Sequence, residues 1–167
     1  MLMTTRRLFF ASLPDEAIRG SLEQSRQRIF PLSGRPVDAA NLHMTVAFLG
    51  AVGEDRLTSL RELSGPMTSC DLKLDRLEFW GKQGVLVAAA SQAPQELKRQ
   101  VDTLWQRLDR LGFARDPRPF KPHVTLARDV RSLRPGMPWT PVHWRCDRVQ
   151  LMESINIPGG VRYEPLV

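Results

Sequence analysis

Two copies of a His-x-Thr motif, His43-Met44-Thr45 and His123-Val124-Thr125, contain two of the 3 histidines in this chain of 167 residues. In an extended strand alternate side chains point to the same face, so the histidine and threonine of each copy lie together, roughly 6.6 Å apart. Each copy therefore presents an imidazole, which titrates near neutral pH, beside a hydroxyl that donates hydrogen bonds. If the two strands face each other, the cleft between them holds a general acid, a general base and two donors for a developing anion.

The sequences around the two motifs share a hydrophobic pattern. In residues 42–48 the even-numbered positions are apolar, which leaves the histidine, the threonine and Ala47 on the opposite face. Residues 123–128 repeat this layout, and Ala127 takes the place of Ala47. The two small alanines are expected to leave room for a ligand. One His-x-Thr motif alone is weak evidence, whereas two matching copies indicate a repeated module.

The rest of the chain predicts an α+β fold in which strands pair in antiparallel fashion. Helices are expected after Pro14-Asp15, over the leucines of 57–63, and from Pro94 to a cap at Gly112. Strands are expected at 7–11, at the two motifs, at 72–79 with one slip of phase, and at 85–90, 149–152 and 161–166. Strands 72–79 and 85–90 are expected to form a hairpin.

Composition and charge limit the classes of function. The chain is 42% hydrophobic, its longest apolar stretch is only 85–90, and its first residues contain arginines without an apolar signal core. We therefore expect a cytoplasmic protein in which Cys70 and Cys146 are reduced.

The net charge of +6 comes mostly from the second half of the chain. Basic side chains gather around the second motif and outnumber its two aspartates. Such a patch attracts polyanions and suits a phosphate-bearing substrate, although an arginine-rich solvated surface would look the same. The basic residues are Arg115, Arg118, Lys121, Arg128, Arg131 and Arg134.

The strings NLHMTVAFLG and PFKPHVTLARD resemble the paired motifs of the 2H phosphoesterase superfamily, and specifically those of bacterial RNA 2′,3′-cyclic phosphodiesterases, formerly called 2′-5′ RNA ligases. The segments RRLFFA, GRPVDAANLH and GGVRY resemble the opening strand, the approach to the first motif and the final strand of that family. The resemblance implies a single bilobal domain over 1–167, with two pseudo-symmetric modules of antiparallel sheet plus helices around a central cleft. Each lobe would contribute one motif.

The resemblance also implies a substrate and roles for the motif residues. The substrate would be RNA or a nucleotide with a 2′,3′-cyclic phosphate, which is opened to a 2′-phosphate by a monomeric enzyme. His43 would protonate O3′ and His123 would activate water, although the residues themselves do not decide between the two roles. Thr45 and Thr125 would stabilise the charge on the phosphate.

Arg128 matches the arginine that follows the second motif in the family, and it is our candidate for a phosphate-binding guanidinium. Strict alternation places it on the opposite face from His123, so it reaches the cleft only where the strand twists, bulges or ends. The same departure in the first motif would place Phe48 beside the cleft as a stacking surface for a base, whereas burial tendency favours a phenylalanine in the core. Trp80 is another possible platform. Relatives often have a tryptophan where this chain has Val87, so the resemblance does not support base contacts at this position.

No metal and no cofactor are expected. Catalytic zinc usually takes three protein ligands, while each motif supplies one imidazole and no carboxylate at the spacing of a helical ligand pair. The third histidine, His143, has no partner threonine and is predicted to be structural or at the surface.

Two other functions are compatible with these residues. The first is 2′-5′ RNA ligation at the same site. The second is a non-catalytic module that holds RNA ends, which predicts RNA binding that is sensitive to salt and survives loss of both motif histidines.

Overall fold

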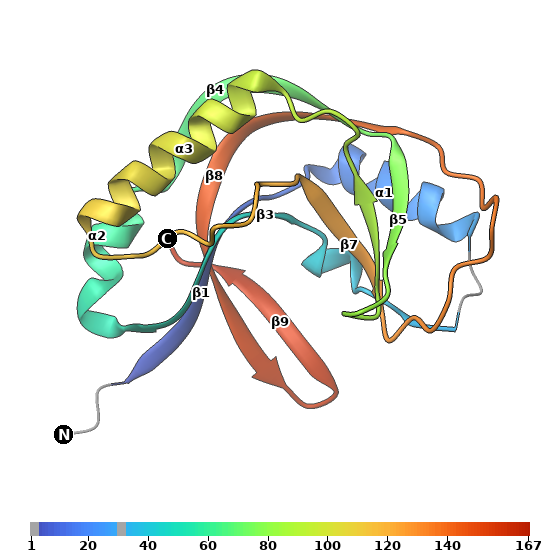
Figure 1. The fold of residues 1–167 in the computed structure, drawn as a ribbon. Coiled ribbons are helices and arrows are strands. Elements are labelled where there is room, and N and C mark those ends of the chain that lie inside the picture. Colours follow the sequence, from blue (N-terminus) through green and yellow to red (C-terminus); the bar gives the residue numbers. More distant parts are fainter. Residues whose placement is uncertain (1–3, 30–32) are drawn as a thin grey trace.

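A computed structural model describes residues 4–29 and 33–167 of the chain. The terminal residues 1–3 and the segment 30–32 lie outside this description. In chain order the elements are β1 (Thr5–Ser12), α1 (Glu16–Gln27), β2 (Arg35–Pro36), the 3₁₀ turn η1 (Ala39–Asn41), β3 (Met44–Gly53), the 3₁₀ turn η2 (Glu54–Arg56), α2 (Leu57–Arg61), β4 (Gly65–Leu74), β5 (Arg76–Trp80), β6 (Val85–Ala89), α3 (Gln95–Arg110), β7 (His123–Arg128), β8 (Val142–Ile157) and β9 (Gly160–Pro165) (Figure 1).

Two sheets organise the fold. The first has the order β3-β1-β8-β4, with β9 paired to β8, and the second has the order β2-β7-β6-β5. Every strand pair found within the described ranges is antiparallel, so the predicted α+β class is confirmed. The first motif spans the start of β3, with His43 directly before the strand, and the second lies at the start of β7; these two strands contact each other. Each sheet thus carries one motif to the line where the sheets meet.

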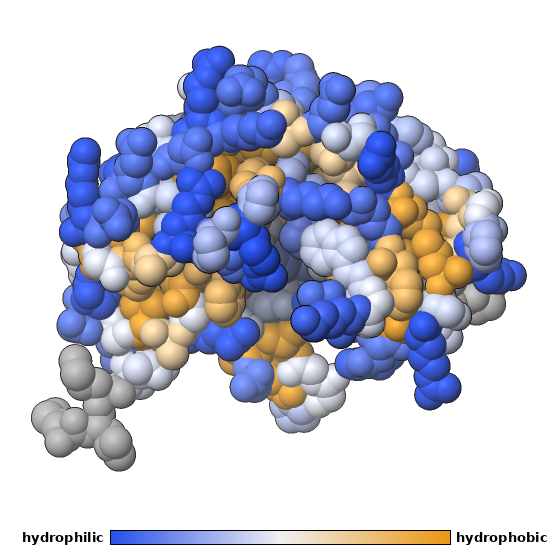
Figure 2. Space-filling model, viewed as in Figure 1, coloured by the Kyte–Doolittle hydropathy of each residue, from blue (hydrophilic) through white to orange (hydrophobic). Residues whose placement is uncertain are grey.

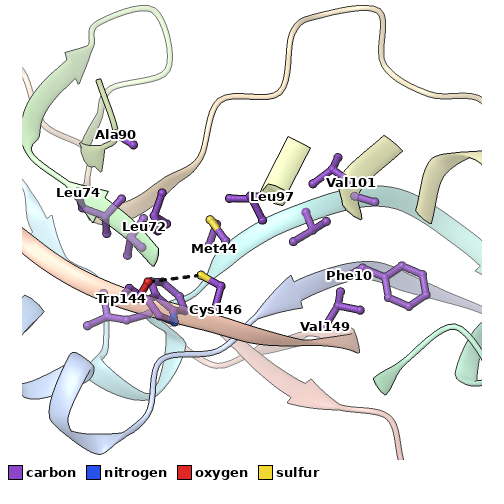
Figure 3. Packing of buried hydrophobic residues seen from close by; sticks show 14 of the residues in the cluster. Phe10, Met44, Leu72, Leu74, Ala90, Leu97, Val101, Trp144, Cys146 and Val149 are labelled. Atoms are coloured by element: carbon purple, nitrogen blue, oxygen red, sulfur yellow. Dashed lines mark hydrogen bonds between the residues drawn. The ribbon is translucent and has the colours of Figure 1, made fainter. Parts of the chain in front are cut away.

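The helices form where the sequence predicts them. Asp15 caps α1, because its carboxylate accepts a hydrogen bond from the backbone N–H of Ile18 at 2.8 Å. The apolar stripe of α3 is buried, and the chain leaves that helix through Gly112, whose φ of 85° favours glycine. α3 contacts β3 and β4. In the core Met44 of β3 lies near Leu97 of α3 and Cys146 of β8 (Figure 3).

Two predictions about strands need correction, and one short strand was not predicted. The segment 72–79 is not one strand: it divides at Asp75 into β4 and β5, which belong to different sheets, so only β5 forms the hairpin with β6. The break falls at Asp75, whose carboxylate accepts hydrogen bonds from the N–H and hydroxyl of Ser91 at 2.8 and 2.6 Å.

The strand predicted at 149–152 is part of the much longer β8, and the short strand β2 was not predicted. The first half of β8 alternates buried residues with exposed charged ones such as Arg145 and Asp147. This alternation is typical of a strand with one face exposed to solvent. The Pro-rich segment before it made the start of the strand hard to recognise in the sequence. No helix of the described ranges is long and apolar enough to cross a membrane.

Candidate active site

A β-bulge interrupts β3 directly after the first motif. Thr45 and Ala47 lie opposite consecutive residues of β1, which leaves Val46 as an extra residue. A bulge reverses the face on which the following side chains lie. Ala47 is therefore buried in the core at 2% exposure, and Phe48 is 51% exposed and faces the cleft. Ala47 does not line the cavity that holds the two motifs, although it lines a neighbouring hollow, and Phe48 is not the core residue that burial tendency favoured.

The same bulge occurs at the same place in β7. Thr125 and Ala127 lie opposite consecutive residues of β6, so Leu126 is the extra residue. Ala127 is completely buried, so for this alanine the prediction that it leaves room for a ligand is wrong. Arg128 is exposed and lines the same cavity as the histidine and threonine of its motif. The bulge that Arg128 needs in order to reach the cleft is therefore present.

The two motif strands enclose a cavity of about 230 Å³. Figure 2, drawn in the same view as Figure 1, shows a hollow near the centre of the molecule. Hydrophilic side chains rim this hollow, which lies over the region where β3 and β7 meet in Figure 1. The structure thus brings together the two motif histidines, the two motif threonines, Arg128 and Phe48. The cavity is lined by Arg7, Phe9, His43, Thr45, Phe48, His123, Thr125, Arg128, Ser154 and Tyr163.

The ring of His43 is held on both sides. Its Nδ1 lies 2.7 Å from the backbone oxygen of Asn41, and its Nε2 lies 3.0 Å from the hydroxyl of Thr45. A carbonyl oxygen only accepts, so Nδ1 carries the proton and Nε2 is the site that exchanges protons. The rings of Phe9 and Tyr163 pack against the imidazole, with centroids 5.1 and 4.8 Å away.

His123 is oriented by the same device. Its Nδ1 donates to the backbone oxygen of Lys121 at 2.8 Å, which again leaves Nε2 for proton transfer. Trp80 packs on this ring with a centroid distance of 4.5 Å. Both histidines thus bond to the carbonyl two residues earlier, so the repeat in sequence produces a repeat in geometry.

The pKa of each motif imidazole is lower than that of a free histidine, which favours the neutral form of both rings. Burial lowers the pKa of His43, and the nearby His123 and Arg128 lower that pKa further, against the opposing hydrogen bond to Asn41. Burial also lowers the pKa of His123; Lys121 adds to this, and the carboxylate of Glu78 opposes it. A bound phosphate anion would act in the opposite direction on both rings, because it stabilises the imidazolium form.

Several residues of the cavity were not found by sequence reasoning. Phe9 comes from β1 and Tyr163 from β9, so their approach depends on sheet pairing and not on spacing along the chain. Asn41 holds β9 in place: its side-chain nitrogen donates to the oxygen of Val161 at 2.8 Å, and its side-chain oxygen accepts from the N–H of Tyr163 at 3.2 Å. The resemblance of the final segment GGVRY to a family strand was the only signal for this part of the site.

Two other residues considered in the sequence lie outside the cavity. His143 is exposed on β8 opposite Lys73, as predicted for a surface residue. Val87 is buried behind Trp80. No group of three or more His, Cys, Asp or Glu side chains that could hold a metal ion occurs in 4–29 and 33–167.

An α+β protein with two opposed His-x-Thr strands and a guanidinium in one cavity has the site of a phosphoesterase. Residues 14–156 match the model of the 2′-5′ RNA ligase superfamily, and the chain belongs to that family. It is 36% identical to the RNA 2′,3′-cyclic phosphodiesterase of Escherichia coli (strain K12), over 96% of this chain and 94% of that protein.

Comparison with solved structures also supports membership of this family. The chain resembles E. coli LigT complexed with 3′-AMP at a TM-score of 0.83 and 32% identity, covering 98% of this chain and 97% of that one. It resembles TT0787 of Thermus thermophilus at a TM-score of 0.75 and 26% identity, covering 96% and 95% of the two chains. The resemblance to 2H phosphoesterases found in the sequence is confirmed.

Proposed function

We propose that this protein is an RNA 2′,3′-cyclic phosphodiesterase, which opens the cyclic phosphate at an RNA end to a 2′-phosphate. The observation that carries the proposal is the pair of motif histidines in one cavity, each with Nδ1 bonded to a carbonyl and Nε2 available for proton transfer. The name of the E. coli relative supports the same substrate, as does the nucleotide in the structure of LigT.

The proposed reaction is an in-line displacement at phosphorus. His123, in its neutral form, takes a proton from water as the water oxygen bonds to phosphorus. The bond between phosphorus and O3′ breaks, and His43, in its protonated form, gives its Nε2 proton to O3′. The products are a free 3′-hydroxyl and a 2′-phosphate, and the two histidines exchange protonation states.

Three donors would stabilise the charge that develops on the non-bridging oxygens. Thr45 and Thr125 line the cavity from opposite strands, and Arg128 brings a planar guanidinium suited to a phosphate. In the free protein the Thr45 hydroxyl is bonded to His43. When His43 is protonated, its Nε2 donates and no longer accepts, so the Thr45 hydroxyl proton is free to bond a phosphate oxygen.

Phe48 is proposed to stack on the base of the terminal nucleotide. Its ring is half exposed, and the guanidinium of Arg7 lies 4.8 Å from the ring centroid. An exposed aromatic ring next to a phosphate cavity suits a nucleobase, and stacking on it does not depend on which base is present.

We also propose that the protein is one bilobal domain that acts as a monomer in the cytoplasm. Both motifs, Arg128 and Phe48 come from the same chain, so the cavity needs no residue of a second copy. The free thiols of Cys70 and Cys146, which face each other across β4 and β8, fit a reducing compartment.

The function can be tested with an RNA oligonucleotide that ends in a 2′,3′-cyclic phosphate, incubated in excess chelator. We expect conversion to the 2′-phosphate, because proton transfer by two imidazoles needs no metal ion. His43→Ala and His123→Ala should each lower kcat by at least about 10²-fold, whereas His143→Ala should have no effect. A 3′-phosphate product, or turnover that stops in chelator and returns with zinc, would contradict the mechanism.

Ligation is a second candidate, which the name of the family favours. A 5′-hydroxyl of another RNA would replace water as the attacking group, and departure of O3′ would then leave a 2′-5′ linkage. Both reactions use the same residues, so adding a 5′-hydroxyl RNA to the assay above would separate them by product.

A further inference from the structure

A second, larger hollow continues from the phosphate cavity. This groove has a volume of about 420 Å³ and runs between β3 and the segment that follows α3. It shares Thr45, Phe48 and His123 with the phosphate cavity, so a ligand can extend from one into the other without a break.

The lining of the groove combines aromatic rings with cations. Phe48 is half exposed, and Trp80 and Phe120, which also line the groove, are partly exposed. Successive bases of a single strand stack on such rings. Trp80 is held in place by its contact with His123, so that a base stacked on it would lie next to the reacting phosphate.

The cations of the groove are Arg115, Arg118 and Lys121. Arg118 is the most exposed of them, at 79% of its side chain, and its partner Asp116 lies 2.5 Å away in the same groove. Exposed ion pairs contribute little to stability, so a phosphate can replace the carboxylate as the partner of Arg118. Arg118 holds the pKa of Asp116 down at about 2, so Asp116 is ionised and repels an anion.

A cyclic phosphate forms the 3′ end of an RNA strand. The rest of the strand therefore extends from the phosphate cavity on the 5′ side only. A third hollow, of about 250 Å³, touches that cavity at Arg128 and is lined by Arg35 and the turn between β8 and β9. Among the described residues that line this third hollow none is aromatic, whereas three partly exposed rings of the larger groove can face a strand. The observations therefore favour the larger groove.

We propose that this groove binds the RNA strand on the 5′ side of the reacting nucleotide, with Arg118 at the next phosphodiester. The preferred substrate is then an oligonucleotide and not a cyclic mononucleotide. This inference rests on the proposed function, and it adds a site for nucleotides that take no part in the reaction.

The test compares kcat/KM on a 2′,3′-cyclic mononucleotide with kcat/KM on a tetranucleotide that has the same cyclic end. Arg118→Ala should lower the ratio of oligonucleotide to mononucleotide activity by about fivefold, the size of one exposed phosphate contact. Asp116→Asn should raise the ratio, because it removes the repelling charge. Arg35→Ala is the matched control: Arg35 is also exposed, lies 2.7 Å from Asp129, and lines the other hollow.

Binding is measured separately by fluorescence anisotropy, using the same tetranucleotide with an unreactive 3′-hydroxyl end. Arg118→Ala should reduce the slope of log affinity against log salt by about 0.7, the value for one phosphate of a single strand. An unchanged ratio and slope would overturn the proposal, and so would a selective loss in Arg35→Ala. If neither cyclic substrate is hydrolysed, the proposed function fails, while the salt slopes still decide whether the groove binds RNA.

Discussion

The backbone oxygen of Asn41 lies 2.7 Å from Nδ1 of His43, while the side chain of the same asparagine holds β9 through Val161 and Tyr163. One residue therefore fixes the tautomer of the imidazole and positions the strand that covers it. Tyr163 packs against His43, so burial of this histidine depends on the hold that Asn41 has on β9. Asn41 acts through other groups and is a positioning residue.

Asn41→Ala keeps the carbonyl but removes both side-chain hydrogen bonds to β9. We expect a loss of about 1 to 2 kcal/mol in the free energy of unfolding. As β9 loosens, His43 becomes better solvated and its lowered pKa rises toward the ordinary value. Since the proposed acid must be protonated, the descending limb of the pH profile should move to higher pH.

Thermal unfolding and kcat/KM against pH check this prediction together. Asn156→Ala is a suitable control, because Asn156 is an exposed asparagine on the same hairpin. A lower activity with an unmoved descending limb would show that Asn41 supports the fold but does not set the protonation of His43.

The pH dependence should differ between kcat/KM and kcat. The profile of kcat/KM reports the free enzyme, in which burial lowers the pKa of both His43 and His123. A lowered pKa keeps the base neutral to lower pH, and it also removes the proton from the acid at lower pH, so both limbs move down. The bound phosphate anion raises both pKa values, so the optimum of kcat should lie at higher pH than that of kcat/KM.

Steady-state rates over a range of pH on a cyclic-phosphate RNA end will show the two optima. Coincident optima, or an optimum of kcat at the lower pH, would mean that the phosphate does not lie between the two imidazoles.

The sequence was sufficient to find the catalytic candidates but not the shape of the strands that hold them. Histidine and threonine two positions apart share a face in any strand, so their proximity follows from spacing alone. The bulges at Val46 and Leu126 depend on register with β1 and β6, which no local pattern specifies. In the sequence each bulge corresponds to two successive apolar residues, Val46-Ala47 and Leu126-Ala127. Both residues of each pair are buried in the structure, where strict alternation predicts one buried residue.

The contacts made by Phe9, Tyr163 and Trp80 are long-range, and they could not be predicted for the same reason. Each of these rings reaches a motif histidine from a different strand, and the order of strands in the sheets decides which rings meet. The helix α3 was predicted closely because its buried stripe and its end at Gly112 are local features.

The two threonines should have separable effects. Thr45→Val and Thr125→Val keep the shape of the strand and remove one donor, and each should reduce transition-state stabilisation by about 2 to 4 kcal/mol. Of the two, Thr45 is the one bonded to the Nε2 of a motif histidine, at 3.0 Å. Thr45→Val should therefore also shift the pH profile, whereas Thr125→Val should lower kcat across the whole range. Single-turnover rates against pH distinguish the two, and identical pH shifts in both variants would contradict the assignment.

Arg128→Lys tests whether the bulge in β7 serves catalysis. Lysine keeps the charge at this position but lacks the planar fork that binds two phosphate oxygens, so a phosphate-binding guanidinium should be impaired even by this substitution. We expect a fall in kcat on both mononucleotide and oligonucleotide substrates, because the reacting phosphate is common to both. Arg131→Lys is the matched control, since Arg131 is an exposed arginine three residues further along the chain. If Arg128→Lys and Arg128→Ala both keep full activity, Arg128 does not bind the reacting phosphate, and its positive charge serves only to attract RNA to the cleft.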